Sequence, residues 1–260
     1  MHCKICNNIS VPFNKATILD KYSVQFFQCT NCHFIQTEDP YWLNEVYSEA
    51  INESDVGLVD RNIRLAKATY NIIHLFFDKK KEYLDYGGGY GLFVRLMRDA
   101  GIQFYRYDIY CRNLFAIGFD VCLDNRKQFE LITSFEVFEH LVDPVGVINE
   151  LLGYSNNIFF STRLVPSSNP KPIEWWYYGL DHGQHISLYT RDSLEILAKK
   201  FNLSLSTDGT FLHLLTEKSI PPLLFRIAAH RKLGKLINSS LKKKSLIPED
   251  YEKITGRPLA

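Results

Sequence analysis

The chain has 260 residues, of which 46% are hydrophobic and 23% are charged, and its formal net charge is +1. The composition is that of a soluble globular protein, and the length suits one α/β domain with a small additional module. A net charge near zero excludes a strong overall attraction to nucleic acid or to an anionic membrane. The sequence has neither a signal-peptide pattern nor an apolar run long enough to span a bilayer, so we expect a cytoplasmic protein without a transmembrane segment.

The amino-terminal residues 1–45 predict a small metal-binding module. They contain two Cys-x-x-Cys pairs, formed by Cys3, Cys6, Cys29 and Cys32. Four thiolates on two tight turns suit a structural Zn²⁺, which prefers sulfur ligands and closed four-coordination. Between the pairs, residues 24–28 alternate like a strand, which is typical of a zinc ribbon. A redox-active cysteine pair is the alternative, and His2 or His33 in place of one thiolate is a variant of the zinc site.

Residues 46–220 alternate between predicted helices and predicted strands. The predicted helices are 56–77, 92–100, 144–153 and 191–200. The predicted strands are 82–86, 103–107, 119–123, 129–134 and 157–161, followed by two strands that flank a hairpin turn at Asp208 and Gly209. This alternation implies an α/β domain with a mostly parallel sheet that is covered by helices on both faces.

The last predicted segment is a basic helical tail over residues 221–260, which begins after Pro221 and Pro222. Apolar residues recur in it at helical spacing among several lysines and arginines. We expect this tail to pack on the domain or to form a contact in a homodimer. Binding to a membrane surface or to another partner is the alternative for a basic amphipathic helix.

The most informative motif follows the first strand of the central domain and is rich in glycine. Glycine lets main-chain amides approach a ligand closely and adopts positive φ without strain. A dinucleotide-binding turn that starts at Gly87 needs glycine at its sixth position, where Leu92 stands. The pattern Asp85-x-Gly87-x-Gly89-x-Gly91 instead resembles the first motif of class I S-adenosylmethionine-dependent methyltransferases. That resemblance implies that these residues hold the methionine part of the cofactor, and an ordinary glycine-rich turn is the alternative.

Two further aspartates follow predicted strands, where ligands of open α/β sheets bind. Asp108 follows the second strand and is placed to accept hydrogen bonds from the two ribose hydroxyls of the cofactor. A helix cap is the alternative for this residue. Asp124 follows the third strand and could reach the adenine amino group, although Asp124 and Asn125 also suit a turn.

The end of the fourth strand reads Phe135-Glu136-Val137-Phe138-Glu139-His140-Leu141. It resembles the segment of many small-molecule methyltransferases in which an apolar strand runs into Glu-x-x-Glu-His-Leu. With the glycine motif and Asp108, the resemblance implies the Rossmann-like, seven-stranded methyltransferase sheet, which is mostly parallel and ends in an antiparallel hairpin. It also implies cofactor contacts from Phe135 and Glu136.

A long loop after the fifth strand carries the candidates for acceptor binding and catalysis. We expect its aromatic side chains to stack on a sugar or another ring, with a lid or a core contact as the alternative; they are Trp175, Trp176, Tyr177 and Tyr178. A hydroxyl acceptor needs a general base, and the candidates are His182 and His185, followed by His140. Asp181 could orient a neighbouring histidine. No carboxylate cluster stands out, so we expect no catalytic Mg²⁺.

The cysteine module joined to this core is similar to methyltransferases that act on nucleotide-linked deoxysugars and surface polysaccharides. The resemblance implies methyl transfer to an oxygen of a small metabolite, such as a sugar, a nucleotide sugar or a phosphorylated precursor. C-methylating relatives carry a further large α/β domain, which disfavours C-methylation here. The alternatives are N-methylation of an amino sugar, methylation of RNA through the zinc ribbon, and a non-catalytic scaffold. We expect a small-molecule partner rather than nucleic acid.

Overall fold

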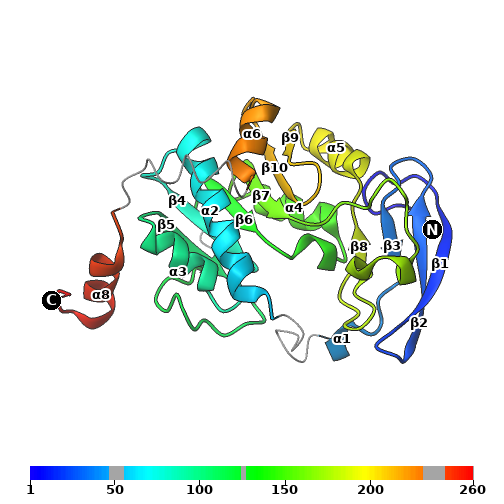
Figure 1. Cartoon of the computed structure of the whole chain (residues 1–260), viewed down its shortest axis with the longest axis horizontal. Coiled ribbons are helices and arrows are strands. Elements are labelled where there is room, and N and C mark those ends of the chain that lie inside the picture. The colour runs from blue at the N-terminus through cyan, green and yellow to red at the C-terminus, as the bar shows by residue number, and fades with distance from the viewer. Residues whose placement is uncertain (47–55, 124–126, 231–243, 260) are drawn as a thin grey trace. The chain divides into compact units, whose positions relative to one another are not determined.

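The computed structural model describes residues 1–46, 56–123, 127–230 and 244–259 (Figure 1). The chain forms two compact units. Unit 1 comprises Met1–Asn52, Phe135–Leu152 and Phe160–Ser219, and unit 2 comprises Glu53–Ser134, Gly153–Phe159 and Ile220–Ala260. In the part of the chain that the structure describes, every helix is too short or too polar to cross a bilayer.

The larger sheet has six strands in the order β5-β4-β6-β7-β10-β9. Their bounds are β4 Glu82–Tyr86, β5 Gln103–Tyr107, β6 Leu131–Ser134, β7 Asn157–Ser161, β9 Ser204–Thr207 and β10 Leu212–Thr216. Strand β4 pairs in parallel with β5 and with β6, whereas β9 and β10 pair antiparallel. The prediction of a mostly parallel sheet that ends in an antiparallel hairpin is confirmed.

One predicted strand of the larger sheet does not form among the described residues. Residues 119–123 contribute a single parallel bridge, between Asp120 and Arg106. Among the described residues the sheet therefore has six strands, where the sequence predicted seven. Asp124, the predicted adenine contact, lies outside the described residues.

Unit 2 contains four described helices, of which α2 and α3 lie within the predicted helices 56–77 and 92–100. They are α2 Leu58–Phe76, α3 Leu92–Asp99, α6 Pro222–Ala229 and α8 Ile247–Thr255. Helix α2 buries Leu65, Ala68 and Ile72, whose spacing places them on one face. The Asn71 side chain donates to the carbonyl of Ala228, 3.1 Å away, and so ties α6 to α2. Helices α6 and α8 are the described parts of the predicted tail, whose residues 231–243 lie outside the description.

Unit 1 contains a second sheet that the sequence predicted only in part. Its order is β1-β2-β3-β8, with bounds β1 Ser10–Ile18, β2 Tyr22–Cys29, β3 Ile35–Thr37 and β8 Ser187–Leu188. The first three strands belong to the cysteine module, whereas β8 comes from the long aromatic loop and lies beside β3 (Figure 1). Ile35 pairs with Leu188 and Gln36 with Ser187. The aromatic loop is therefore part of a sheet.

The remaining elements of unit 1 are short. They are α1 Leu43–Val46, α4 Pro144–Leu152, α5 Arg191–Lys200 and the 3₁₀ turns η2 Phe138–His140, η3 Pro172–Glu174 and η4 Trp176–Tyr178. Asp143 begins α4 as predicted, because its carboxylate accepts from the Gly146 amide at 3.0 Å. The core of this unit joins side chains of the cysteine module to side chains of the aromatic loop: Ile18, Val24, Phe26, Ile35, Trp42, Tyr177, Tyr178, Ile186 and Leu188.

Thr190 connects the cysteine module to helix α5. Its hydroxyl donates to the Cys32 carbonyl and accepts from the Ser193 amide at 3.1 Å, which makes it the N-cap of α5. The Ser193 hydroxyl accepts from the Thr190 amide in return.

We expect Thr190→Ala to lower the free energy of unfolding by roughly 1–2 kcal/mol, because both the cap and the bond to Cys32 are lost. Urea unfolding followed by circular dichroism measures this change. Thr17→Ala, at an exposed position on β1, is the control and should change stability by less than about 0.5 kcal/mol. Equal effects of the two substitutions would contradict the role of Thr190.

Candidate functional site

The glycine turn of unit 2 has the backbone that its sequence predicts. Gly87, Gly89 and Gly91 have φ values of 70°, 52° and 85°, a region in which other residues are strained. Gly88 is required for space, because a Cβ there would lie 2.8 Å from Oδ2 of Asp85. The turn therefore consists of backbone without side chains of its own, which allows a ligand to approach the main chain closely.

Arg106 of β5 holds this turn in place, and the sequence did not single it out. Its Nε donates to the Gly89 carbonyl at 2.6 Å, and its Nη1 donates to the Asp120 carboxylate at 2.6 Å. Nη2 donates to the carbonyl of Cys111. The side chain is buried, and Nε, Nη1 and Nη2 each donate to an acceptor. These bonds make Arg106 a rigid clamp that fixes the glycine turn against β5. A lone arginine in a strand gives no sequence signal for such a role.

Asp85 is buried at the end of β4, with 3% of its surface exposed. The Thr133 hydroxyl donates to its Oδ1 at 2.7 Å. Burial raises the pKa of Asp85 to about 7, and the neighbouring Asp108 acts in the same direction. The carboxyl group is thus poised to ionise near neutral pH.

Asp108 lies where the sequence predicted it, after β5. One carboxylate oxygen accepts from the Gly89 amide at 2.8 Å. The other accepts from the amides of Tyr110 and Cys111 at 2.8 and 2.7 Å. Asp108 therefore fixes the glycine turn and the loop after β5 relative to each other. A carboxylate has about four acceptor positions, so these three bonds leave it able to accept a further hydrogen bond.

Phe135 and Glu136 follow β6 and belong to unit 1, whereas Asp85 and Asp108 belong to unit 2. Glu136 has a φ of 56°, which is uncommon for a residue with a side chain. The Ser161 hydroxyl donates to the Glu136 carboxylate at 2.6 Å and accepts from its amide at 2.9 Å. These two bonds hold a backbone conformation of the kind that concentrates at functional sites.

His185 lies beside β8 with its ring fixed by the main chain. A carbonyl oxygen can only accept, so the contact between Nδ1 and the Tyr177 carbonyl places the ring proton on Nδ1. Nε2 of the neutral ring then carries a lone pair. Burial lowers the pKa of His185, which keeps the ring neutral at physiological pH.

His182 has the opposite tautomer. The Gln184 amide donates to Nδ1 of His182 at 3.2 Å, so the lone pair of Nδ1 is used and the proton of the neutral ring is on Nε2. Burial lowers its pKa to about 4. Gly179, with a φ of 58°, makes room for this ring, because a Cβ there would lie 2.3 Å from the imidazole. Asp181 approaches Nε2 only to 4.0 Å.

His140 is the third member of a histidine group in unit 1. Its ring centroid lies 5.2 Å from that of His185, which in turn lies 4.8 Å from that of His182. Burial lowers the pKa of His140 well below its usual value. The three candidate bases are thus brought together, although His140 and His182 are 42 positions apart in the chain. Of the two preferred candidates, His185 has the lone pair on Nε2.

The four aromatic side chains that were predicted to bind an acceptor lie in different environments. Tyr177 and Tyr178 are each 1% exposed and belong to the core of unit 1. Trp175 packs against that core, whereas Trp176 is 72% exposed. The guanidinium of Arg163 lies 5.4 Å from the Trp176 ring. Trp176 is therefore the member of the group with a large exposed ring.

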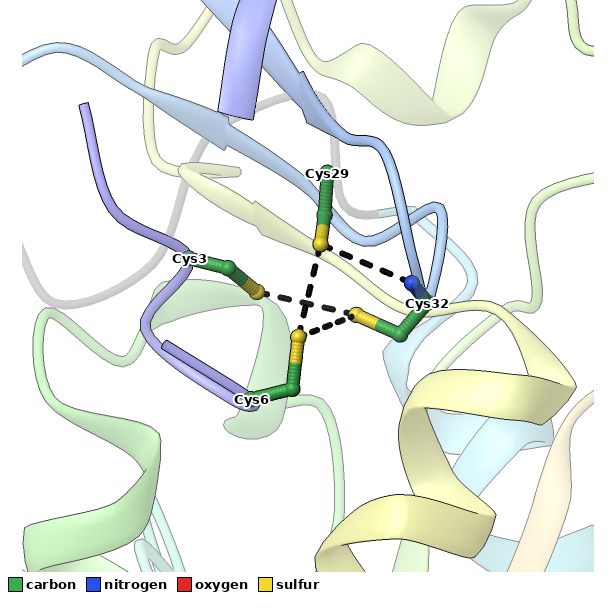
Figure 2. Close-up of side chains that lie close together, drawn as sticks. All are labelled: Cys3, Cys6, Cys29 and Cys32. Carbon is green, nitrogen blue, oxygen red and sulfur yellow. Dashed lines mark hydrogen bonds between the residues drawn. The ribbon is translucent and has the colours of Figure 1, made fainter. Parts of the chain in front are cut away.

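The four predicted metal ligands converge from two turns of unit 1 (Figure 2). Their sulfur atoms are 3.4 Å apart between Cys6 and Cys29, and 3.6 Å apart between Cys3 and Cys32 and between Cys6 and Cys32. A tetrahedral zinc with bonds of about 2.3 Å needs sulfur atoms roughly 3.8 Å apart. The thiols are free, and the amides of Ile5 and Asn31 point at the sulfurs of Cys3 and Cys29. This geometry fits one tetrahedral metal ion.

A protein-family model described as "Methyltransferase domain" matches residues 59–207. No curated protein sequence matches the chain. Among solved structures, the chain is similar to the plantazolicin methyltransferase BpumL in complex with SAH, with 14% identity and a TM-score of 0.44 over 66% of this chain and 94% of that one.

Two further solved structures show a similar degree of likeness. CalO1, a methyltransferase in calicheamicin biosynthesis in its SAH-bound form, has 16% identity and a TM-score of 0.47 over 62% of this chain and 54% of that one. An O-methyltransferase family protein from Burkholderia thailandensis has 11% identity and a TM-score of 0.45 over 69% of this chain and 68% of that one.

The buried carboxyl group of Asp85 predicts a pH-dependent stability. Its pKa is about 7 in the folded chain and about 4 in the unfolded chain. At a pH between these two pKa values, the Asp85 carboxyl is protonated in the folded chain and ionised in the unfolded chain. The free energy of unfolding therefore falls as pH rises through this range, by a few kcal/mol in total. We expect Asp85→Asn to remove this fall and to stabilise the protein above about pH 7.

Urea unfolding at about pH 5 and about pH 8 tests the expectation for Asp85. Asp20→Asn, at an exposed position in a turn, is the matched control and should keep the pH dependence of the wild type. An Asp85→Asn variant that loses stability with rising pH as steeply as the wild type would contradict the prediction.

Proposed function

Since the chain belongs to the methyltransferase-domain family, as a class I S-adenosylmethionine-dependent enzyme, we propose that it methylates a hydroxyl oxygen of a small metabolite. The observation that carries this proposal is the fixed tautomer of His185, whose Nε2 presents a lone pair. A hydroxyl must lose its proton as the new carbon–oxygen bond forms, and an imidazole lone pair is the usual acceptor near neutral pH.

The cofactor supplies an activated methyl group, and the protein supplies position and shelter from water. We assign cofactor binding to the glycine turn with Asp85 and Asp108, and to Phe135 and Glu136 after β6. The Asp85 carboxyl can neutralise positive charge because it ionises near neutral pH. The rigid clamp of Arg106 supports the assignment, since a preformed turn loses little entropy when it binds a ligand.

We assign the proton-acceptor role to His185 and a positioning role to His140 and His182. His182 is the weaker candidate base, because its Nδ1 accepts the Gln184 amide and its Nε2 carries the proton. In the proposed step, the acceptor oxygen attacks the methyl carbon, the carbon–sulfur bond breaks, and the hydroxyl proton passes to Nε2 of His185. The products are the methyl ether, S-adenosylhomocysteine and a protonated imidazole.

The acceptor class that fits these residues is a sugar, a nucleotide sugar or a phosphorylated precursor of a surface polysaccharide or natural product. The exposed ring of Trp176 offers a face for a sugar ring, and Arg163 beside it offers a charge for a phosphate. The low net charge supports a small-molecule acceptor over RNA.

Six free cysteines support a reducing, cytoplasmic location.

We also propose that Cys3, Cys6, Cys29 and Cys32 hold a structural Zn²⁺. All four positions are filled by protein ligands, so the ion has no open position for catalysis. The ion instead supports the aromatic loop, because the Thr190 hydroxyl donates to the Cys32 carbonyl and β8 pairs with β3.

His185→Gln tests the catalytic assignment. We expect kcat to fall by roughly 100-fold to 10,000-fold while the affinity for S-adenosylhomocysteine stays within about twofold of the wild type. Calorimetry with S-adenosylhomocysteine measures the affinity, and methyl transfer to an acceptor found by screening nucleotide sugars and phosphorylated metabolites measures kcat. His182→Gln is the comparison and should reduce kcat much less. If the two variants lose the same activity, His185 is not the base.

Cys29→Ser tests the zinc proposal. Removing one of four thiolates should release the ion and unfold the sheet of the cysteine module, since a structural zinc contributes directly to folding. Elemental analysis of the purified protein should find about one zinc fewer in Cys29→Ser than in the wild type, and an unchanged zinc content in Cys122→Ser, whose cysteine is exposed and lies outside the cluster. Full retention of zinc by Cys29→Ser would disprove the assignment.

A further inference from the structure

Unit 1 contains a second group of potential metal ligands, which lies apart from the four cysteines. One carboxylate oxygen of Glu139, one ring nitrogen of His140 and one ring nitrogen of His185 all lie within 4.8 Å of one another. Glu139 is fully buried, whereas both histidine rings keep partial exposure. Ligands of a metal ion with bonds of about 2.1 Å are roughly 3.0–3.4 Å apart, so a small inward rotation of these side chains would close the group on an ion.

The main chain holds the three side chains together. The Ile186 amide donates to the Glu139 carbonyl at 2.9 Å. One residue further, the Ser187 hydroxyl donates to the Leu141 carbonyl at 2.7 Å. These two bonds fix the 3₁₀ turn η2, which carries Glu139 and His140, against the segment that carries His185. The two main-chain segments that carry the group are therefore held side by side.

The hydrogen bonding of His185 is that of a metal-binding histidine. Such histidines usually donate one ring N–H to a carbonyl or carboxylate, which orients the other nitrogen toward the ion. In His185 the Tyr177 carbonyl accepts from Nδ1 and leaves Nε2 for the ion. Burial lowers the pKa of both His140 and His185, which keeps them in the neutral form that binds metals.

We propose that Glu139, His140 and His185 bind one divalent transition-metal ion of the Zn²⁺ or Co²⁺ class. Two imidazoles and one carboxylate favour such ions over Mg²⁺ and Ca²⁺, which prefer oxygen ligands. Three protein ligands leave at least one position open for water or for a hydroxyl group. The site does not depend on the proposed methylation, but an ion there occupies the lone pair with which His185 would otherwise accept a proton.

A two-step titration of the full-length protein tests this site. The cysteine cluster is first filled with one equivalent of Zn²⁺, and Co²⁺ is then added at neutral pH while the visible absorption of the bound cobalt is followed. We expect the wild type to bind one equivalent of Co²⁺ with the weak bands of nitrogen and oxygen ligands. His185→Gln and Glu139→Gln should weaken binding by more than about 100-fold, because even outer-shell changes cost 10–100-fold.

His182→Gln is the matched control, since its ring stacks edge-on with His185 but does not belong to the ligand group. It should bind Co²⁺ like the wild type. His140→Gln provides a second variant in case the buried Glu139→Gln fails to fold, and zinc retained in the cysteine cluster verifies that each variant is folded.

The proposal is overturned if the wild type binds no Co²⁺ or if the folded ligand variants bind it unchanged. Methyl transfer without added Co²⁺ is measured separately, so failure of the metal site and failure of the proposed function are distinguishable.

Discussion

The pairing of β8 with β3 is the interaction on which unit 1 depends. Two residues of the aromatic loop, Ser187 and Leu188, complete a sheet that starts in the cysteine module. The pairing with β3 fixes the main chain of β8. It therefore also positions His185, which lies two residues before β8. Thr190 extends the connection through its bond to Cys32. The cysteine module thus serves as a support for the loop with the candidate base.

In unit 2, the corresponding constraint is a network around the glycine turn. Glycine removes side chains from the turn, so other residues must hold its shape. Arg106 donates to the Gly89 carbonyl and Asp108 accepts from the Gly89 amide, so both main-chain groups of one glycine are tied down. Buried charge has a cost, and here it is offset by multiple hydrogen bonds to each charged group. These bonds hold the turn in one conformation.

Two neighbouring histidines show how local hydrogen bonds separate the roles of similar residues. The carbonyl next to Nδ1 of His185 and the amide next to Nδ1 of His182 impose opposite tautomers. Burial lowers the pKa of both rings, so at neutral pH the difference between them is the position of the proton rather than the charge. The same lone pair on His185 suits both proton transfer and metal binding, and occupation by an ion excludes the first.

The sequence by itself determined the features that depend on local spacing. The helix and strand periods, the glycines with positive φ and the two cysteine turns could all be predicted, because each is set by residues close together in the chain. Only the tertiary structure decided that β8 joins the amino-terminal sheet, that Arg106 clamps the turn, that Tyr177 and Tyr178 are core residues, and that Glu139 meets His185. These outcomes depend on contacts between distant segments, to which spacing along the chain gives no guide.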